Sequence, residues 1–556
     1  MRRTVRWQVL LIGVGMALVA ILLTYLALTY TTTQVPTAGG TYVEGVAGVP
    51  HYINPLLSAY NEADRDLCAL VFNGLTRFNG QGDVVPDLAE SWEVSLDGLT
   101  YVFHLRDNVY WHDGVPFTAD DVVFTVRLLQ APDYPGPPDV GALWRTVKIA
   151  KVDDYTVRMI LPEPFAPFLD YTTIGLLPAH LLEGVSSADL PALEFNLKPV
   201  GTGPFQVVEV ETADGEIRSV LLERNRRYFR PGPLVDYFRF RFYPSYSTAF
   251  RAYRNGDVEG VGRVELQDLP EARQDDDLNL YSAQLAQYSL IYLNLLKADD
   301  LPFFQEVEVR QALLYGLDRQ AIVQDLLDGQ AIVAHSPIVA GTWAYDPQIR
   351  RYDYDPEQAQ ALLDEAGWTL PPQGGVRTKD GRPLSFELLA STDPLREAIA
   401  EEVARQWGEL GIGVTVVTTG PVDVRDALEQ RSYQAALVDL ALPGDPDPYP
   451  LWHQTEITQG QNYAGLDHRR ISEIIETARI VTDRQQRIDL YREFQQVFAD
   501  EVPAILLFHP VYTYGVSNKV KGVQIGPLMY PSDRFATVNR WYVATKRVII
   551  SQAGGP

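Results

Sequence analysis

The sequence predicts a mixed α/β protein of two to four domains, preceded by one N-terminal hydrophobic helix. Three observations lead to this prediction. The chain has 556 residues, more than a single hydrophobic core usually organises. Segments with the two-residue period of strands alternate with segments that have the period of helices. An uncharged run of 24 residues, 7–30, stands near the N-terminus.

The N-terminal run is long enough to cross a membrane. As a helix it would measure about 36 Å at 1.5 Å per residue. The preceding residues 1–6 carry three arginines, which stay cytoplasmic and leave the bulk of the chain outside. A cleaved signal peptide is the alternative, but its apolar region is usually shorter and ends at a small-residue site. We expect a cytoplasmic tail 1–6, a transmembrane anchor or uncleaved signal 7–30 and a flexible linker 31–40.

Three later segments show their secondary structure clearly. Residues 99–106 alternate between apolar and polar side chains, as a half-buried strand does. The segment 307–329 has the apolar spacing of one helix face. A further helix is capped by Asp355, opened by Pro356 and ended by Gly367. Together they predict strands and helices interleaved along the chain.

Charge and cysteine content exclude several functions. The net charge is −25, so the surface repels phosphate backbones and nucleic acid is not an expected partner. Cys68 is the single cysteine, which rules out a disulfide within the chain and a cysteine-based zinc site. Its apolar helical surroundings indicate a buried small side chain.

One stretch, residues 111–129, looks like a chemical site. It holds His112, Asp113, Asp120 and Asp121 within ten positions. However, Thr118 precedes an apolar helical pattern and Asp121 follows it by three residues, the spacing of a capping box. A metal site needs at least three converging ligands. We therefore expect these residues to build the fold.

The same region carries a resemblance to a known family. The pattern "PDLAESWEVSLDGLTYVFHLR" at 86–106 is followed by "WHDGVPFTADDVV" at 111–123. Further along stand "VGTGPF" at 200–205 and "LPFFQEVEVRQALLYGLDRQAIV" at 301–323. These patterns resemble the family 5 extracytoplasmic solute-binding proteins, the peptide- and oligopeptide-type receptors of ABC importers. The resemblance covers nearly everything from residue 41 to about 545.

The resemblance implies a two-lobed α/β fold of the periplasmic-binding-protein type with an extra inserted domain. Lobe 1 would combine 41–77, 198–285 and 512–548, the inserted domain would be 78–197, and lobe 2 would be 286–511. The lobes would close around a ligand and dock on ABC transporter permease subunits. It implies no covalent chemistry, no cofactor and no metal.

One expected ligand contact departs from the family's pattern. In peptide-binding members, a carboxylate shortly before an acidic-proline element pairs with the ammonium group of the peptide. Aligning Asp445-Pro446 with that element places Leu442 at the carboxylate position. Asp439, Asp445 or Asp447 could substitute, or the ligand carries no ammonium group. The two aspartates beside proline are also good loop-capping residues.

Aromatic and amide side chains are further candidates for ligand contacts. Tyr60 lies in the first-lobe segment and Tyr512 lies where the chain would return across the hinge. Trp452 and Asn462-Tyr463 follow the acidic cluster. Aromatic rings suit such clefts because one face is apolar and a hydroxyl can hydrogen-bond. Ordinary packing is the alternative for each of them.

The favoured function is a monomeric, membrane-anchored solute receptor that delivers a peptide or similar small molecule to an importer. An oligosaccharide ligand and a sensor that signals through the anchor are alternatives. A surface hydrolase is disfavoured, because neighbouring carboxylates such as Glu401-Glu402 point about 100° apart on a helix. The chain also lacks the G-x-S-x-G, H-E-x-x-H and P-loop patterns.

Overall fold

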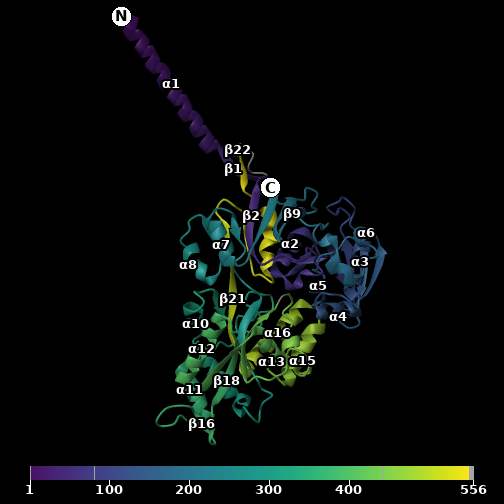
Figure 1. Cartoon of the computed structure of the whole chain (residues 1–556), viewed down its shortest axis with the longest axis vertical. Coiled ribbons are helices and arrows are strands. Elements are labelled where there is room, and N and C mark those ends of the chain that lie inside the picture. The colour runs from purple at the N-terminus through teal and green to yellow at the C-terminus, as the bar shows by residue number, and fades with distance from the viewer. Residues whose placement is uncertain (1, 80–81, 443, 550–556) are drawn as a thin grey trace.

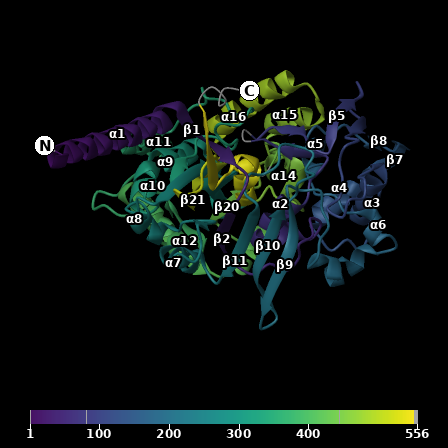
Figure 2. The ribbon, with the colours of Figure 1, turned by 90° about the horizontal axis from the view of Figure 1, so that it is seen from above.

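The structure is a computed structural model that describes residues 2–79, 82–442 and 444–549. Helix α1 (Arg2–Thr31) extends away from a body that is divided into an upper and a lower part (Figure 1). Seen from above, α1 leaves the body on the side opposite to α3 (Ala119–Gln130) and α6 (Ala179–Leu182) (Figure 2). Among the described residues, no helix reaches the length and apolar content that a membrane crossing needs.

A two-stranded ribbon joins α1 to the body. Strand β1 (Thr32–Thr37) follows α1 directly and pairs antiparallel with β22 (Ala544–Ile549) near the other end of the chain. The structure thus places six residues of the predicted linker 31–40 in a strand. Residues next to both strands bond to the body: Gly39 N donates to Leu234 O at 2.9 Å, and Tyr542 pairs with Lys521.

The register of this ribbon gives a direct prediction. Val35 lies opposite Lys546, and a one-residue shift puts a side chain on the other face. The variant Val35→Cys/Lys546→Cys is therefore expected to form a disulfide in most molecules under mild oxidation. The matched variant Val35→Cys/Arg547→Cys is expected to form little. Electrophoresis under non-reducing conditions measures both yields, and Cys68 is buried in both. Equal yields would mean that the strands are not paired in this register.

Three clusters of buried apolar side chains divide the body. The first contains residues between 42 and 278 and between 512 and 541, and we name this part the upper half. The other two contain residues between 288 and 508, which form the lower half. Each half therefore has hydrophobic cores of its own.

One twelve-stranded sheet runs through both halves. Its order is β19-β18-β20-β14-β21-β12-β2-β11-β10-β9, with β13 and β15 also paired to β21. The long strand β21 (Ala504–Ser517) crosses from the lower half to the upper half (Figure 1). It pairs antiparallel with β14 in the lower half and with β13 in the upper half. This strand therefore belongs to the sheet of both halves and links them covalently.

The elements of the upper half surround its part of the sheet. Its strands are β2 (Thr41–Ala47), β9 (Phe205–Ala213), β10 (Glu216–Arg224), β11 (Tyr237–Tyr243), β12 (Gly260–Val261) and β13 (Leu278–Gln284), with the pair β3 (Thr76–Phe78) and β4 (Val84–Pro86). Its helices are α2 (Glu62–Val71), α7 (Tyr246–Arg254) and α8 (Leu269–Ala272), with the 3-10 turns η1 (Ser58–Tyr60) and η7 (Pro531–Arg540).

The lower half has helices on both sides of its strands. The strands are β14 (Gln287–Leu293), β15 (Ala331–Val333), β18 (Ser385–Ser391), β19 (Gly413–Thr419) and β20 (Ala435–Ala441), with the short pair β16 (Thr378–Lys379) and β17 (Arg382–Pro383). The helices are α9 (Val307–Tyr315), α10 (Arg319–Asp325), α11 (Pro356–Glu365), α12 (Pro394–Glu409), α13 (Pro421–Glu429), α14 (Tyr449–Trp452), α15 (Arg469–Ile480) and α16 (Arg484–Glu501).

A separate four-stranded sheet lies within the upper half and forms what we call the inserted unit, residues 89–182. Its antiparallel order is β5-β6-β8-β7, from β5 (Ala89–Val94), β6 (Thr100–Leu105), β7 (Lys148–Asp153) and β8 (Thr156–Ile160). Its helices are α3, α4 (Pro138–Thr146), α5 (Phe168–Tyr171) and α6. The predicted strand at 99–106 is confirmed as β6, with alternating buried side chains.

Helix α3 confirms the interpretation of the stretch at 111–129. Thr118 and Asp121 form a reciprocal capping box at its start. His112 bonds to backbone groups of Gly201 and Gly203. Within the described residues, no group of three or more His, Cys, Asp or Glu side chains could hold a metal. The capping box and the His112 contacts show that this stretch builds the fold.

The predicted helix at 307–329 is divided in two. Helix α9 ends at Tyr315 and α10 begins at Arg319. Asp318 causes the break, because its side chain accepts a hydrogen bond from Ala321 N at 2.8 Å and starts a new helix. The prediction of one continuous helix is wrong here, since the apolar spacing continues across the break.

Candidate ligand-binding cavity

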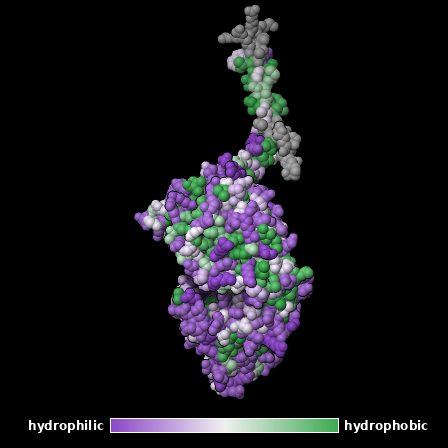
Figure 3. Space-filling view, turned by 90° about the vertical axis from the view of Figure 1, so that its right-hand side faces the viewer, coloured by the Kyte–Doolittle hydropathy of each residue, from purple (hydrophilic) through white to green (hydrophobic). Residues whose placement is uncertain are grey.

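A cavity of about 990 Å³ lies between the upper and lower halves. The surface is hollowed where the halves meet (Figure 3). The lining residues come from 55–79, 134–140, 165–175, 228–231 and 530–540 of the upper half and from 441–451 of the lower half, with a few others. Its volume falls at the upper end of the range for small-molecule sites.

Charged side chains of both signs line the cavity. Five are arginines and six are aspartates: Arg65, Arg77, Arg230, Arg479 and Arg540, with Asp87, Asp139, Asp170, Asp445, Asp447 and Asp533. Aromatic and apolar side chains, including Tyr134, Val140 and Ile174, fill the wall between them. A solute with both charged and apolar groups matches such a lining.

The loop after β20 supplies the lower wall. Asp445 accepts two hydrogen bonds from Arg487 at 2.5 and 2.6 Å and one from Tyr491. Asp447 pairs with Arg479 at 3.0 Å. Burial, offset in part by the Arg479 charge, raises the pKa of Asp447 to about 6. Both carboxylates of this loop are thus neutralised by arginines on α15 and α16.

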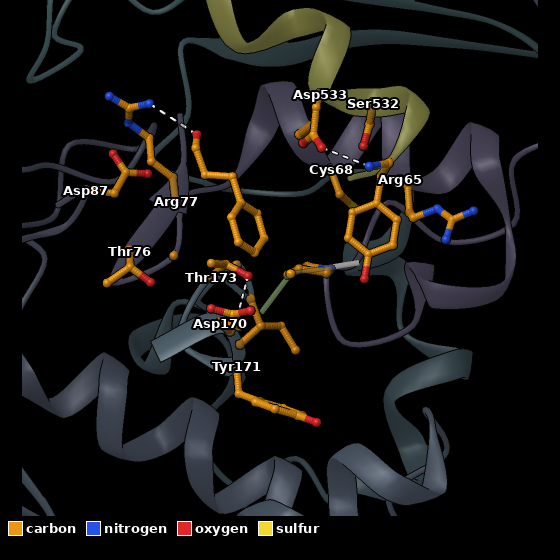
Figure 4. Close-up of a pocket in the computed structure, with 18 of the residues that line it drawn as sticks. Arg65, Cys68, Thr76, Arg77, Asp87, Asp170, Tyr171, Thr173, Ser532 and Asp533 are labelled. Atoms are coloured by element: carbon orange, nitrogen blue, oxygen red, sulfur yellow. Dashed lines mark hydrogen bonds between the residues drawn. The ribbon is translucent and has the colours of Figure 1, made fainter. Parts of the chain in front are cut away.

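Asp170 of α5 faces that loop from the inserted unit. It accepts a hydrogen bond from the backbone N–H of Asp445. Burial and the nearby Asp445 charge raise the pKa of Asp170 to about 7. Figure 4 shows the side chain beside Thr173, whose hydroxyl donates to the Asp170 carbonyl at 2.7 Å. Asp170 also borders a smaller cavity of about 200 Å³ on the far side of this contact.

A second charged group lies in the upper half. Asp87 is buried, accepts from Asn73 at 2.8 Å and pairs with Arg230 at 3.3 Å. Burial raises the pKa of Asp87 despite the positive charges of Arg230, Arg77 and Arg106. Arg77, on the same side of the cavity, donates to the carbonyl of Phe78 and has no ion-pair partner among the described residues (Figure 4). Two guanidinium groups therefore share one carboxylate here.

Contacts across the cleft hold the halves together. Arg484 of α16 pairs with Asp83 of the upper half at 2.5 Å. Ala166 N of the inserted unit donates to Arg479 O at 2.8 Å. These contacts close the cleft on the side of the inserted unit, while the cavity stays partly open to the surface.

Comparison with known proteins identifies the family. Residues 83–462, more than half of the chain, match the family described as "Bacterial extracellular solute-binding proteins, family 5 Middle". This protein belongs to that family. As a family 5 protein it captures a small solute outside the cytoplasm for an ABC importer. The resemblance in the signature region is thus confirmed.

Curated relatives match over most of their length. Oligopeptide-binding protein AppA of Bacillus subtilis is 30% identical over 523 residues, covering 92% of this chain and 92% of the relative. A dipeptide-binding protein of Escherichia coli is 28% identical over 515 residues, covering 86% of this chain and 91% of the relative. A heme-binding protein A of Haemophilus influenzae is 29% identical over 520 residues, covering 89% and 91%.

Solved structures share the fold. AppA of Bacillus subtilis in complex with a nonapeptide matches with a TM-score of 0.68 and 28% identity, covering 92% of this chain and 100% of that one. NikZ of Campylobacter jejuni in complex with Ni(L-His) matches with a TM-score of 0.70 and 28% identity, covering 90% and 99%. The expected α/β periplasmic-binding-protein fold is therefore confirmed.

In this family 5 protein, three of the predicted contact residues line the cavity. They are Leu442, at the position where the family's pattern has a carboxylate, and the two aspartates Asp445 and Asp447. Asp439 lies outside the lining and pairs with Arg396 and Ser289. Asp439 belongs to β20, three residues before Leu442, and its side chain contacts Arg396 of α12 instead of the cavity.

The other predicted residues lie away from the lining. Tyr60 is 74% exposed on η1. Tyr512 is buried and its hydroxyl donates to the carbonyl of Gly262. Trp452 is buried against Phe498, with 4.7 Å between ring centroids. Asn462 is buried and donates to two backbone carbonyls, which shapes the loop after α14.

Sequence reasoning missed the charged residues of the upper half. Asp170 lies within the segment "EPFAPFLDY" at 163–171, close to prolines and aromatic residues. That composition could have marked it, because such loops often line binding sites. Arg77 and Arg230 lie 153 residues apart, and nothing in the sequence links them.

Proposed function

We propose that this protein is a membrane-anchored receptor that binds a peptide or a similar zwitterionic solute and hands it to the permease subunits of its importer. The observation that carries the proposal is the cavity between the two halves, which is lined by five arginines and six aspartates. An oligosaccharide is disfavoured, since a neutral ligand would leave Arg77 and Arg230 with the single carboxylate of Asp87 as their shared counter-charge.

The proposal includes two lobes that hinge. Lobe 1 would comprise 41–77, 198–285 and 512–548 with the inserted domain 78–197, and lobe 2 would comprise 286–511. The separate hydrophobic clusters of the two halves support this division. The shared strand β21 crosses between them near residue 511, where a hinge is expected. Ligand binding would stabilise the closed form by its higher affinity for that form.

The anchor would be residues 7–30, with residues 1–6 in the cytoplasm and the rest outside as a monomer. The 24 uncharged residues and the arginines before them support this arrangement. Apolar side chains of α1 such as Leu11 and Ile21 are each 65% exposed and pack against no part of the body. Their burial in lipid would account for that exposure. The output is a change of shape and transfer of solute, without catalysis.

Titration calorimetry with a pool of tetrapeptides, and separately with a pool of oligosaccharides, tests the ligand class. We expect binding to peptides only, with a decrease in the radius of gyration measured by small-angle scattering. The variant Arg77→Met is expected to lower peptide affinity at least about tenfold, because it removes a guanidinium that makes no direct ion pair in the described residues and is free to bind a ligand carboxylate. Arg226→Met, an exposed arginine outside the cavity, is the matched control. Binding of oligosaccharides without peptides would contradict the proposal.

A further inference from the structure

The closed cleft brings two carboxylates of like charge together. Asp170 belongs to the inserted unit and Asp445 to the lower half, 275 residues away. The backbone N–H of Asp445 donates to the Asp170 carboxylate, and we call this contact between the two halves the seam. Both residues line the large cavity and the smaller one behind it. The seam therefore separates the two cavities.

The arginines near this seam are already paired. Arg487 forms a bidentate ion pair with Asp445, and Arg479 forms an ion pair with Asp447 at 3.0 Å. Within the described residues, Asp170 makes no ion pair with Lys, Arg or His. Three carboxylates thus face two guanidinium groups, which leaves one negative charge without a partner. Asp170 is half-buried, and an unpaired charge with little access to water is costly, so a positive charge is needed there.

Gly444, next to Asp445 at the seam, has no room for a side chain. Gly444 has a φ of +87°, and a Cβ atom built there would overlap the Asp170 carboxylate. The other face of Asp170 borders the cavity. A ligand group in the cavity can therefore reach the carboxylate, while the loop closes over it from the other side.

We propose that closure of the cleft requires one positive charge at Asp170, supplied by a cationic group of the ligand or, in the empty receptor, by a proton. This inference rests on the proposed two-lobed receptor and adds what the ligand must carry. Asp170 thereby becomes a residue that determines specificity, favouring solutes with an ammonium or similar group. It also opposes closure of the empty receptor at neutral and higher pH.

The surroundings of Asp170 agree with this role. The charged and titratable groups that face it are Asp445 and Asp447 on the loop, Arg487 on α16, Tyr171 beside it, Tyr530 before η7, and the Asp83–Arg484 pair across the smaller cavity. The Asp83–Arg484 pair adds no net charge. Burial and Asp445 raise the pKa of Asp170 to about 7 in the closed form, whereas an exposed aspartate titrates near 4. Closure therefore takes up a proton, and falling pH favours it.

The empty receptor provides the first test. Energy transfer between labels at Leu96→Cys and Val422→Cys, both exposed, reports the closed fraction without any ligand. Lowering the pH from 8 to 5 is expected to raise the ratio of closed to open molecules at least about tenfold. In Asp170→Asn the ratio should be high at pH 8 and nearly constant with pH. Asp133→Asn, an exposed aspartate of the same unit, should behave as the wild type.

Two outcomes of this test would overturn the proposal. One is a closed-to-open ratio that does not change with pH in the wild type. The other is an equal pH response in Asp170→Asn, which would assign the proton to another group. Neither outcome depends on which solute the receptor binds, so failure here is distinct from failure of the peptide proposal.

A matched pair of ligands provides the second test. Tetra-alanine has an N-terminal ammonium group, and N-acetyl-tetra-alanine lacks it. The wild type is expected to bind the free peptide at least about tenfold more tightly at pH 8, and Asp170→Asn should lose that preference. Equal preference in both proteins would contradict the role of Asp170. If neither peptide binds the wild type, the peptide proposal fails, while the pH test still decides the role of the seam.

Discussion

Replacing Arg534 with methionine is expected to destabilise the protein by about 3–5 kcal/mol. Arg534 lies on η7 and is fully buried. Its guanidinium donates to Glu44 of β2 at 2.7 Å and to Asp66 of α2 at 2.5 and 2.7 Å. The variant would leave two buried carboxylates without a counter-charge. Burial already raises the pKa of Asp66 to about 6 with the arginine present.

Thermal and urea unfolding of the two proteins at pH 8 measure this effect. High pH matters, because protonation of the stranded carboxylates at low pH would relieve part of the cost. Arg425→Met is the matched control, since its partner Asp426 lies 3.4 Å away in an exposed pair. That change is expected to cost less than about 1 kcal/mol. Similar losses in both variants would show that the buried cluster contributes no more than an exposed ion pair.

Local signals in the sequence were sufficient for much of the fold. The capping box of Thr118 and Asp121 and the cap of Asp355 lie within three residues of the groups that they bond, so spacing alone reveals them. Asp318 shows where such local signals fail. It also caps a helix, but the apolar spacing on both sides of it predicted one long helix and hid the break between α9 and α10. Competing local signals therefore limit such predictions.

The candidate site was harder to predict, because its geometry depends on distant contacts. The loop at Leu442 and Asp445 could be found, since it follows a buried strand and matches a known pattern. Asp170 could not be placed against it, because the contact spans 275 residues and forms only where the halves meet. Asp439 illustrates the converse. It was a reasonable ligand contact in sequence, but Arg396 of α12 pairs with it outside the cavity.

Replacing Gly444 with alanine is expected to weaken ligand binding at least about tenfold while leaving both halves folded. The residue has a φ of +87°, which a side chain adopts only at a cost of about 1–2 kcal/mol. The added Cβ would also overlap the Asp170 carboxylate of the inserted unit. Relief of that overlap requires the loop to move away, so the closed form should lose more free energy than the open form.

Binding of the tetrapeptide pool and the closed fraction, measured with the same pair of labels, should both fall in Gly444→Ala. The unfolding temperature should fall no further than in Gly184→Ala, because only the backbone cost is present in the open form. Gly184→Ala separates the two causes: this glycine has a φ of +83° and no atom within 4 Å of an added Cβ. It carries the backbone cost alone and should bind as the wild type. Unchanged closure in Gly444→Ala would show that the halves do not approach this closely when ligand is bound.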